Sequence, residues 1–217
     1  MRHFVNHGLR GPNVMTVPVN RSIVAEFDSP ELHRSSGFES MNPNWDSDIR
    51  WVSPSTPETH EIFESAFERM GIGDRVRYYL DIENEVRLYA GFLVIRSECR
   101  TPHFHVDWIK TGNEAFTMLT PVTPNSGGFG LLYKTLTGQV AEYNYKPGEA
   151  ILFGDDFDHS TKPGRSAQPV VLLCFEFGTD KMEHWPKIYH TIGQQSGMLR
   201  QPDGKFVETG LGPRSGY

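Results

Sequence analysis

The sequence predicts a mainly β fold, a jelly roll (double-stranded β-helix) with one or more flanking helices. Between residues 86 and 177, seven or eight short β-rich segments are separated by turn residues about every 8–12 positions, which is typical of sandwiches and barrels. Gly and Pro make up 36 of the 217 residues, above the usual share of about 12 % and consistent with many tight turns. The hydrophobic fraction of 37 % is enough for a sizeable core and excludes whole-chain disorder.

The expected organisation is a single domain over residues 1–217, with its jelly-roll core at 86–177. Residues 1–85 would form an N-terminal arm, with an edge strand at the apolar stretch 22–27, and a packing helix. That helix is predicted to start at Pro57, after the N-cap residue Thr56, and to stop at Gly71. Its apolar face repeats at the helical period and comprises Ile62, Phe63, Ala66, Phe67 and Met70.

The predicted strands of the core follow one another with short connections. They are 87–96, 104–109, 115–122, 130–136, 140–145, 150–153 and 170–177. Turn signals separate several of them, at 125–128, 137–138, 147–148 and 163–164. The C-terminal extension, 178–217, carries a turn signal at 201–205, and it could serve as a lid, a packing arm or a homodimer contact.

Charge and cysteine content narrow the possible partners. The formal net charge is −6, the wrong sign for binding phosphate backbones, so we expect no nucleic-acid partner. No apolar run approaches the ~18 residues that span a bilayer, and the N-terminus has no apolar signal core. We therefore expect no membrane association and a cytoplasmic location. Only Cys99 and Cys174 are present, whereas there are nine His, so a metal site would use nitrogen and oxygen ligands.

The segment His103-Phe104-His105-Val106-Asp107-Trp108 carries the clearest chemical signal. On a strand, His103, His105 and Asp107 would point to one face and Trp108 to the other. A His and an Asp two positions apart can aim an imidazole nitrogen and a carboxylate oxygen at one point. His105 and Asp107 are therefore candidate metal ligands, and His103 is expected to be a substrate-pocket residue.

His159 is the candidate third ligand. It stands 54 residues after His105 and follows a Pro-Gly turn, an apolar strand and a short acidic loop, which could return the chain to the first two ligands. Two His and one carboxylate on one face of a metal leave positions open for other molecules. This arrangement suits non-haem Fe(II) that binds O2 together with a co-substrate.

This pattern of His105-x-Asp107 followed by His159 resembles the Fe(II)/2-oxoglutarate-dependent dioxygenases over roughly residues 86–177. The resemblance implies Fe(II), 2-oxoglutarate as co-substrate and O2, with hydroxylation of an unactivated C–H bond of a small molecule and release of succinate and CO2. Retention of Asp107 favours hydroxylation over halogenation, because the halogenating relatives replace this carboxylate with a small residue. The phytanoyl-type and prolyl-hydroxylase-like branches both remain open.

The family also places a cation, usually an Arg, some nine to eleven residues after the distal His to bind the far carboxylate of 2-oxoglutarate. Here Val170 stands in that region, and the nearest Arg is Arg165. Arg165 is the first candidate for this role. The other candidates for contact with the co-substrate are Arg87, Lys134, Tyr89 and Thr120.

Two alternatives stay open at the level of sequence. A cupin-type metal-dependent dioxygenase or isomerase without 2-oxoglutarate would use a similar jelly roll, and His103-Phe104-His105 imitates its His-x-His motif. That family expects a Glu shortly after the second His, where this chain has Trp108-Ile109-Lys110. A non-catalytic binding module would leave the aligned ligands without a purpose.

Overall fold

The computed structural model describes residue 9 and residues 11–42, 48–123 and 128–209. Two sequence-based expectations fall outside the described residues: the absence of a signal core at the N-terminus, and most of the turn at 125–128. The strands are β1 Val14–Pro18, β2 Phe38–Met41, β3 Arg50–Pro54, β4 Arg87–Cys99, β5 Ala115–Pro121, β6 Gly130–Lys134, β7 Val140–Asn144, β8 Glu149–Phe153, β9 His159–Thr161, β10 Gly164–Gly178, β11 Met198–Arg200 and β12 Phe206–Glu208. The helices are α1 Arg21–Ala25, α2 Pro57–Met70, α3 Ile72–Val76 and α4 Trp185–Ile192, with short 3-10 turns η1 Leu32–Arg34, η2 Arg77–Tyr79 and η3 Met182–His184.

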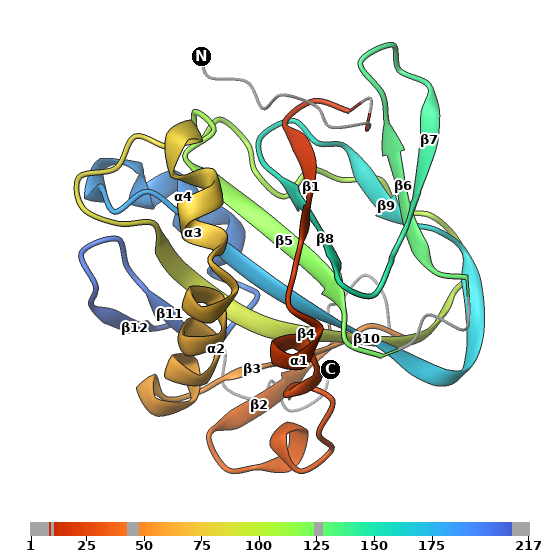
Figure 1. Ribbon diagram of the computed structural model, residues 1–217, viewed down its shortest axis with the longest axis horizontal. Coiled ribbons are helices and arrows are strands. Elements are labelled where there is room, and N and C mark those ends of the chain that lie inside the picture. The colour runs from red at the N-terminus through yellow and green to blue at the C-terminus, as the bar shows by residue number, and fades with distance from the viewer. Residues whose placement is uncertain (1–8, 10, 43–47, 124–127, 210–217) are drawn as a thin grey trace.

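Two antiparallel sheets form the core, as predicted for a jelly roll. The large sheet has the strand order β1-β8-β5-β10-β4-β3-β2, and the small sheet has the order β7-β6-β9. In Figure 1 the large sheet crosses the middle of the molecule, α2 and α3 cover one side of it, and β6, β7 and β9 lie at the other end. The prediction of a mainly β fold with flanking helices is confirmed.

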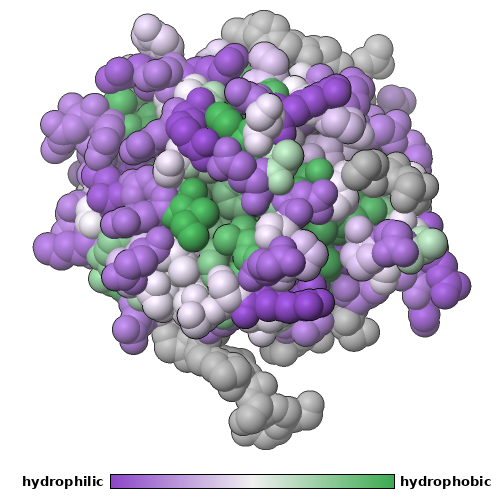
Figure 2. All heavy atoms as spheres, turned by 60° about the horizontal axis from the view of Figure 1, so that its bottom comes forward, coloured by the Kyte–Doolittle hydropathy of each residue, from purple (hydrophilic) through white to green (hydrophobic). Residues whose placement is uncertain are grey.

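The long central strand β10 divides the interior into two apolar clusters. Its residues alternate between faces: Leu173, Phe175 and Phe177 belong to the cluster under α2, whereas Leu172 and Cys174 belong to the cluster toward the small sheet. The second face is therefore the floor of the space enclosed by the two sheets. On the face shown in Figure 2 the surface is mostly hydrophilic, with apolar side chains in small separate areas.

Helix α2 begins and ends where the sequence predicts. The Thr56 hydroxyl accepts a hydrogen bond from the Thr59 backbone N–H at 3.3 Å, and Gly71 ends the helix with φ of +63°. Phe63 rests directly on Gly91 of β4, where an added Cβ would lie 2.5 Å from the Phe63 Cβ. The buried face of the helix differs slightly from the predicted one. Ile62 is 40 % exposed, and His60 is buried in its place.

Two predicted strands are wrong. The stretch 22–27 forms helix α1, whose first turn is capped by the Asn20 side chain accepting from the Ser22 N–H at 2.9 Å. The stretch 104–109 forms a loop with one isolated bridge, in which His105 and His159 exchange backbone hydrogen bonds of 2.9 Å. Within the described residues, none of the helices is both long and apolar enough to cross a lipid bilayer.

The C-terminal extension packs against the core. Trp185, Ile188 and Ile192 of α4 belong to the apolar cluster that also holds the strands around the enclosed space. The Thr191 hydroxyl donates to the Asp107 carbonyl at 2.7 Å, so the end of α4 is attached to the loop that carries the candidate ligands. The predicted turn at 201–205 joins β11 to β12 through a Gln201 N–H to Lys205 O bond of 2.8 Å.

Candidate metal centre

The structure brings His105, Asp107 and His159 together. One ligand atom from each lies within 4.8 Å of the others, and this is the one such cluster of metal-ligating side chains found among the described residues. The Asp107 Oδ1 is 3.4 Å from the His105 Nε2 and 3.8 Å from the His159 Nε2. The backbone bridge between His105 and His159 fixes the loop against β9, so a full strand is not needed to align the ligands.

Hydrogen bonds to the backbone set the tautomer of both imidazoles. The Nδ1 of His105 lies 3.0 Å from the His103 carbonyl, and the Nδ1 of His159 lies 2.9 Å from the Phe157 carbonyl. A carbonyl oxygen only accepts, so each Nδ1 must carry the proton and donate it. In the neutral rings the lone pairs are then on the two Nε2 atoms, which face Asp107.

A short hydrogen-bond chain orients the carboxylate. The Trp108 indole N–H donates to the Thr117 hydroxyl at 2.9 Å, and that hydroxyl donates to the Asp107 Oδ2 at 3.0 Å. The Oδ1 is left on the side of the two imidazoles. Trp108 is completely buried, as its predicted orientation away from the ligands requires, and it ties the carboxylate to the core.

The electrostatics favour the metal-binding form of Asp107 and of His159, whereas metal binding at His105 must displace a proton. Burial would raise the pKa of Asp107, but His159, His105 and the Thr117 hydrogen bond outweigh it and lower the pKa to about 2. Burial lowers the pKa of His159, against the opposing effect of Asp107. Burial disfavours the charged form of His105 too, but Asp107 overrides it and raises that pKa. An ionised carboxylate beside convergent imidazoles fits a divalent cation, and two His and one Asp are the donor set of non-haem Fe(II).

The triad lies in a cavity of about 360 Å³ between the sheets. Its walls are largely apolar and include Trp51, Phe92, Val94, Leu119 and Leu172. Its polar lining residues beside the triad include His103, Thr117, Thr161, Glu176, Thr191 and Gln195. Among the described residues, no Lys or Arg lines it.

The five residues expected to contact the co-substrate do not line this cavity. The Tyr89 hydroxyl donates to the Thr179 carbonyl at 2.7 Å, and the Thr120 hydroxyl donates to the Glu149 carbonyl at 3.0 Å. Arg87 pairs with Glu85 at 2.6 Å, and Lys134 pairs with Asp158 beside the ring of Phe104. Arg165 is exposed on the first part of β10, before the register shift that precedes Val170.

Arg96 is the buried cation that the sequence reasoning missed. It is 6 % exposed and pairs directly with Val170 across the β4–β10 ladder. Its guanidinium donates to the Thr161 hydroxyl at 2.9 Å and to the Glu98 carbonyl at 2.8 Å, and Thr161 lines the cavity. Burial raises the pKa of the cavity residue Tyr145, and the charge of Arg96 opposes that rise. The signal was available, because Arg96 shares its strand face with Phe92 and Val94.

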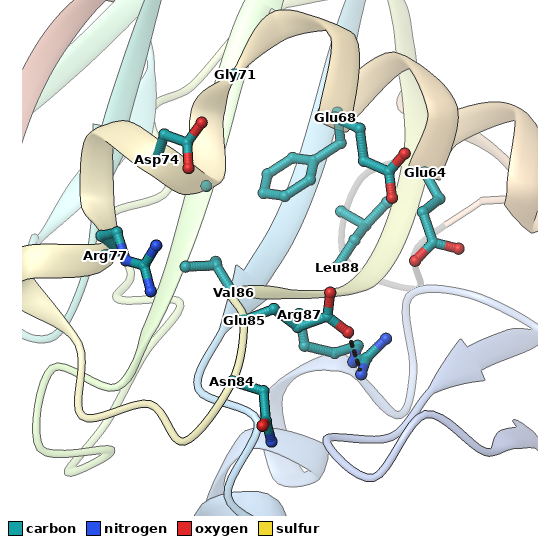
Figure 3. A pocket seen from close by; sticks show the side chains of 12 residues that line it. Glu64, Glu68, Gly71, Asp74, Arg77, Asn84, Glu85, Val86, Arg87 and Leu88 are labelled. Atoms are coloured by element: carbon teal, nitrogen blue, oxygen red, sulfur yellow. Dashed lines mark ion pairs between the residues drawn. The ribbon is translucent and has the colours of Figure 1, made fainter.

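A second hollow, of about 230 Å³, lies beside α2, α3 and the start of β4, on the helix side of the large sheet. Figure 3 shows that its labelled acidic side chains come from both helices and from the segment before β4, with Arg87 held by Glu85. It contains no convergent set of metal-ligating atoms among the described residues. The triad therefore marks the candidate functional site.

A jelly roll that encloses two His and one Asp defines a class, the mononuclear non-haem metal proteins with a facial triad. No family model and no curated protein matches the sequence. Among solved structures, a 2OG-Fe(II) oxygenase family protein from Burkholderia pseudomallei is 12 % identical, with a TM-score of 0.55 over 76 % of this chain and 85 % of that chain.

Two further structures extend this comparison. HygX from Streptomyces hygroscopicus, solved with nickel and 2-oxoglutarate, is 16 % identical, with a TM-score of 0.53 over 77 % of this chain and 83 % of that one. SnoN, a non-haem α-ketoglutarate-dependent epimerase from nogalamycin biosynthesis, is 11 % identical, with a TM-score of 0.61 over 79 % and 77 %. The chain has the fold of the Fe(II)/2-oxoglutarate oxygenases, and the predicted resemblance is confirmed at that level.

Proposed function

We propose that the protein is an Fe(II)- and 2-oxoglutarate-dependent oxygenase that hydroxylates an unactivated C–H bond of a small molecule. The balanced reaction converts substrate, 2-oxoglutarate and O2 into hydroxylated product, succinate and CO2. The observation that carries the proposal is the convergence of two imidazole Nε2 atoms and one ionised carboxylate in a largely apolar cavity of this fold. Iron, when bound, supplies the activation of O2 that is coupled to oxidative decarboxylation of the co-substrate.

The protein's own residues prepare the site. His105, Asp107 and His159 would hold the metal from one side, which leaves room for 2-oxoglutarate and O2 on the other. Thr117 keeps the Asp107 carboxylate in position. A carboxylate at position 107 supports hydroxylation, because it occupies the place that a halide would need.

Arg96 does not itself line the cavity, but it is bonded to the lining residue Thr161, and it is the residue that we assign to the far carboxylate of 2-oxoglutarate. Val170 stands at the usual position of that cation, and cross-strand neighbours in an antiparallel pair have Cβ atoms about 4.5–5.5 Å apart. A long Arg side chain on the neighbouring strand can therefore reach the same region, and a guanidinium matches a carboxylate in a planar fork. Thr161, which is bonded to Arg96, and Tyr145, whose pKa responds to the charge of Arg96, both line the cavity and would complete this end of the site.

The size and lining of the cavity support a small substrate. A volume of about 360 Å³ lies near the lower end of the range for small-ligand pockets, and the co-substrate would occupy part of it. The walls are apolar and no Lys or Arg lines them among the described residues, which disfavours polyanionic substrates. The substrate would enter past His105, whose side chain is 37 % exposed.

The test is anaerobic titration of the Fe(II)-loaded protein with 2-oxoglutarate, followed by assay for succinate under air. A weak visible absorption should develop on addition of 2-oxoglutarate, and succinate should form slowly even without the natural substrate. His159→Ala should abolish both signals. Metal binding without either signal would refute the proposal and favour a cupin-type activity that does not use 2-oxoglutarate.

A further inference from the structure

Glu176 is a buried carboxyl group in the cavity that the proposed chemistry does not use. It is 1 % exposed, it lines the cavity together with the triad, and its Oε2 has no hydrogen-bond partner within the described residues. It projects from β10 on the same face as Leu172 and Cys174. An unpaired polar atom in such a place is costly and calls for a ligand or another explanation.

Two acidic side chains that hold loops in place, Asp155 and Asp180, are fully bonded, whereas Glu39 on β2 has, like Glu176, one buried oxygen without a partner among the described residues, but it does not line the cavity. The carboxylate of Asp155 accepts hydrogen bonds from the Thr111 hydroxyl and from the backbone N–H groups of Gly112 and Asn113. The carboxylate of Asp180 accepts from three successive backbone N–H groups, at residues 83–85. Glu176 departs from this pattern, so holding a loop in place does not explain it.

The position of Glu176 places it near the reacting centre and away from the co-substrate anchor. It pairs across the β10–β5 ladder with Thr117, whose hydroxyl holds Asp107. Arg96 lies opposite Val170, six residues earlier on β10, or about 20 Å along an extended strand. Glu176 and the residue paired with Arg96 therefore lie at separate positions along β10.

We propose that Glu176 accepts a hydrogen bond from a protonated amine of the substrate, whose apolar body lies along Phe92, Leu119 and Leu172. This inference rests on the proposed function and names its substrate class: small amines with an apolar chain or ring. Burial, together with the nearby Asp107, raises the pKa of Glu176, so its carboxyl keeps its proton unless a cation lies beside it, and no Lys or Arg among the described lining residues supplies one. A cationic N–H donor supplies both the charge and the missing hydrogen bond.

The experiment compares three ligands of one length on the Ni(II)- and 2-oxoglutarate-loaded protein, which does not turn over. Hexylammonium, 1-hexanol and hexanoate are titrated at pH 7, and their dissociation constants are measured by ligand-observed NMR. On the wild-type protein hexylammonium should bind at least about tenfold more tightly than hexanol, as expected for a hydrogen bond to a charged group. Hexanoate should bind most weakly.

Glu176→Gln should remove the preference for the ammonium ligand and leave the affinity for 2-oxoglutarate unchanged. The control is Glu142→Gln on β7, which changes an exposed carboxylate that pairs with Lys162. This variant should leave the preference intact. Glu176→Met should lose the preference too, and its thermal midpoint should be equal to or above that of the wild type, because an unpaired buried carboxyl has been replaced by an apolar group.

Equal binding of hexylammonium and hexanol to the wild type, or a preference retained in Glu176→Gln, would overturn the inference. A thermal midpoint of Glu176→Met well below the wild type would do so as well, because it would indicate a structural bond. The titrations are repeated with Ni(II) alone. If 2-oxoglutarate does not bind, the proposed function fails, whereas the ammonium preference of the metal-only protein still decides the role of Glu176.

Discussion

Replacement of Arg96 by Met tests the position of the co-substrate anchor. Met has an unbranched apolar side chain, so the change removes the charge and the hydrogen-bond donors while keeping much of the volume. The donations to Thr161 and Glu98 and the ion pair with Asp48 are lost with the guanidinium, whereas the Thr117 hydrogen bond to Asp107 does not involve Arg96. We expect binding of 2-oxoglutarate to weaken strongly while binding of the metal stays the same.

The size of the effect follows from the burial of Arg96. Removing one partner of a buried, hydrogen-bonded charge pair typically costs about 2–5 kcal/mol, or about 30-fold to several thousandfold in affinity. Arg96→Lys keeps the charge but loses the planar fork, so its loss should be intermediate. Arg165→Met is the matched control, because Arg165 is exposed, and it should change the affinity by less than about threefold.

The assay is calorimetric titration of each Ni(II)-loaded variant with 2-oxoglutarate, after a separate titration with the metal. Circular dichroism and thermal melting confirm that Arg96→Met is folded. The assignment fails if a folded Arg96→Met protein binds 2-oxoglutarate within threefold of the wild type. A strong loss of 2-oxoglutarate affinity in Arg165→Met would instead support Arg165, the residue that the sequence alone favours for this role.

Three further predictions address the site, its pH response and the core. Thr117→Val removes the hydrogen bond to Asp107, so the metal affinity measured by competition with a chelator should fall about 10–100-fold; an unchanged affinity would contradict the orienting role. Burial lowers the pKa of His60 to about 4, so the unfolded chain takes up a proton first as the pH falls below 6.5, and about 3 kcal/mol of stability should be lost between pH 6.5 and 4. The free energy of unfolding, measured with urea, should depend less steeply on pH in His60→Gln than in the wild type over this range. Parallel pH dependences of the two proteins would refute the assignment. Gly91→Ala forces a Cβ against Phe63 and should lower the free energy of unfolding by about 1–3 kcal/mol without changing 2-oxoglutarate binding.

Two of the three ligands could be predicted because their geometry is local, whereas His159 lies 54 residues from His105 and was predicted from the turn, strand and loop that precede it. Two residues two positions apart in an extended segment point the same way, and this holds for His105 and Asp107 although the segment is a loop with a single bridge. Helix α2 was equally predictable, because Thr56, Pro57 and Gly71 act on the backbone next to them. The pairing of His105 with Asp107 and the ends of α2 both rest on interactions within a few residues of chain.

The failures arise where a distant segment decides. The stretch 22–27 has the composition of a strand, but Asn20 caps it as a helix at its start, and the resulting helix α1 packs against α2. The apolar pattern there cannot show that the edge of the large sheet is already occupied by β1. Tyr89 and Thr120 sit on strands of the core as expected, yet their hydroxyls are used by the Thr179 and Glu149 carbonyls, which lie 90 and 29 residues away in the chain.

The cation illustrates the same limit most directly. A search along the chain from His159 reaches Val170 and Arg165 but cannot see the strand beside them. In the folded sheet the neighbours of Val170 are set by hydrogen-bond register, and the register places Arg96 there. A ligand responds to the position of a charge in space and not to the strand that carries it. An Arg at position 96 can therefore serve the same function as an Arg at position 170.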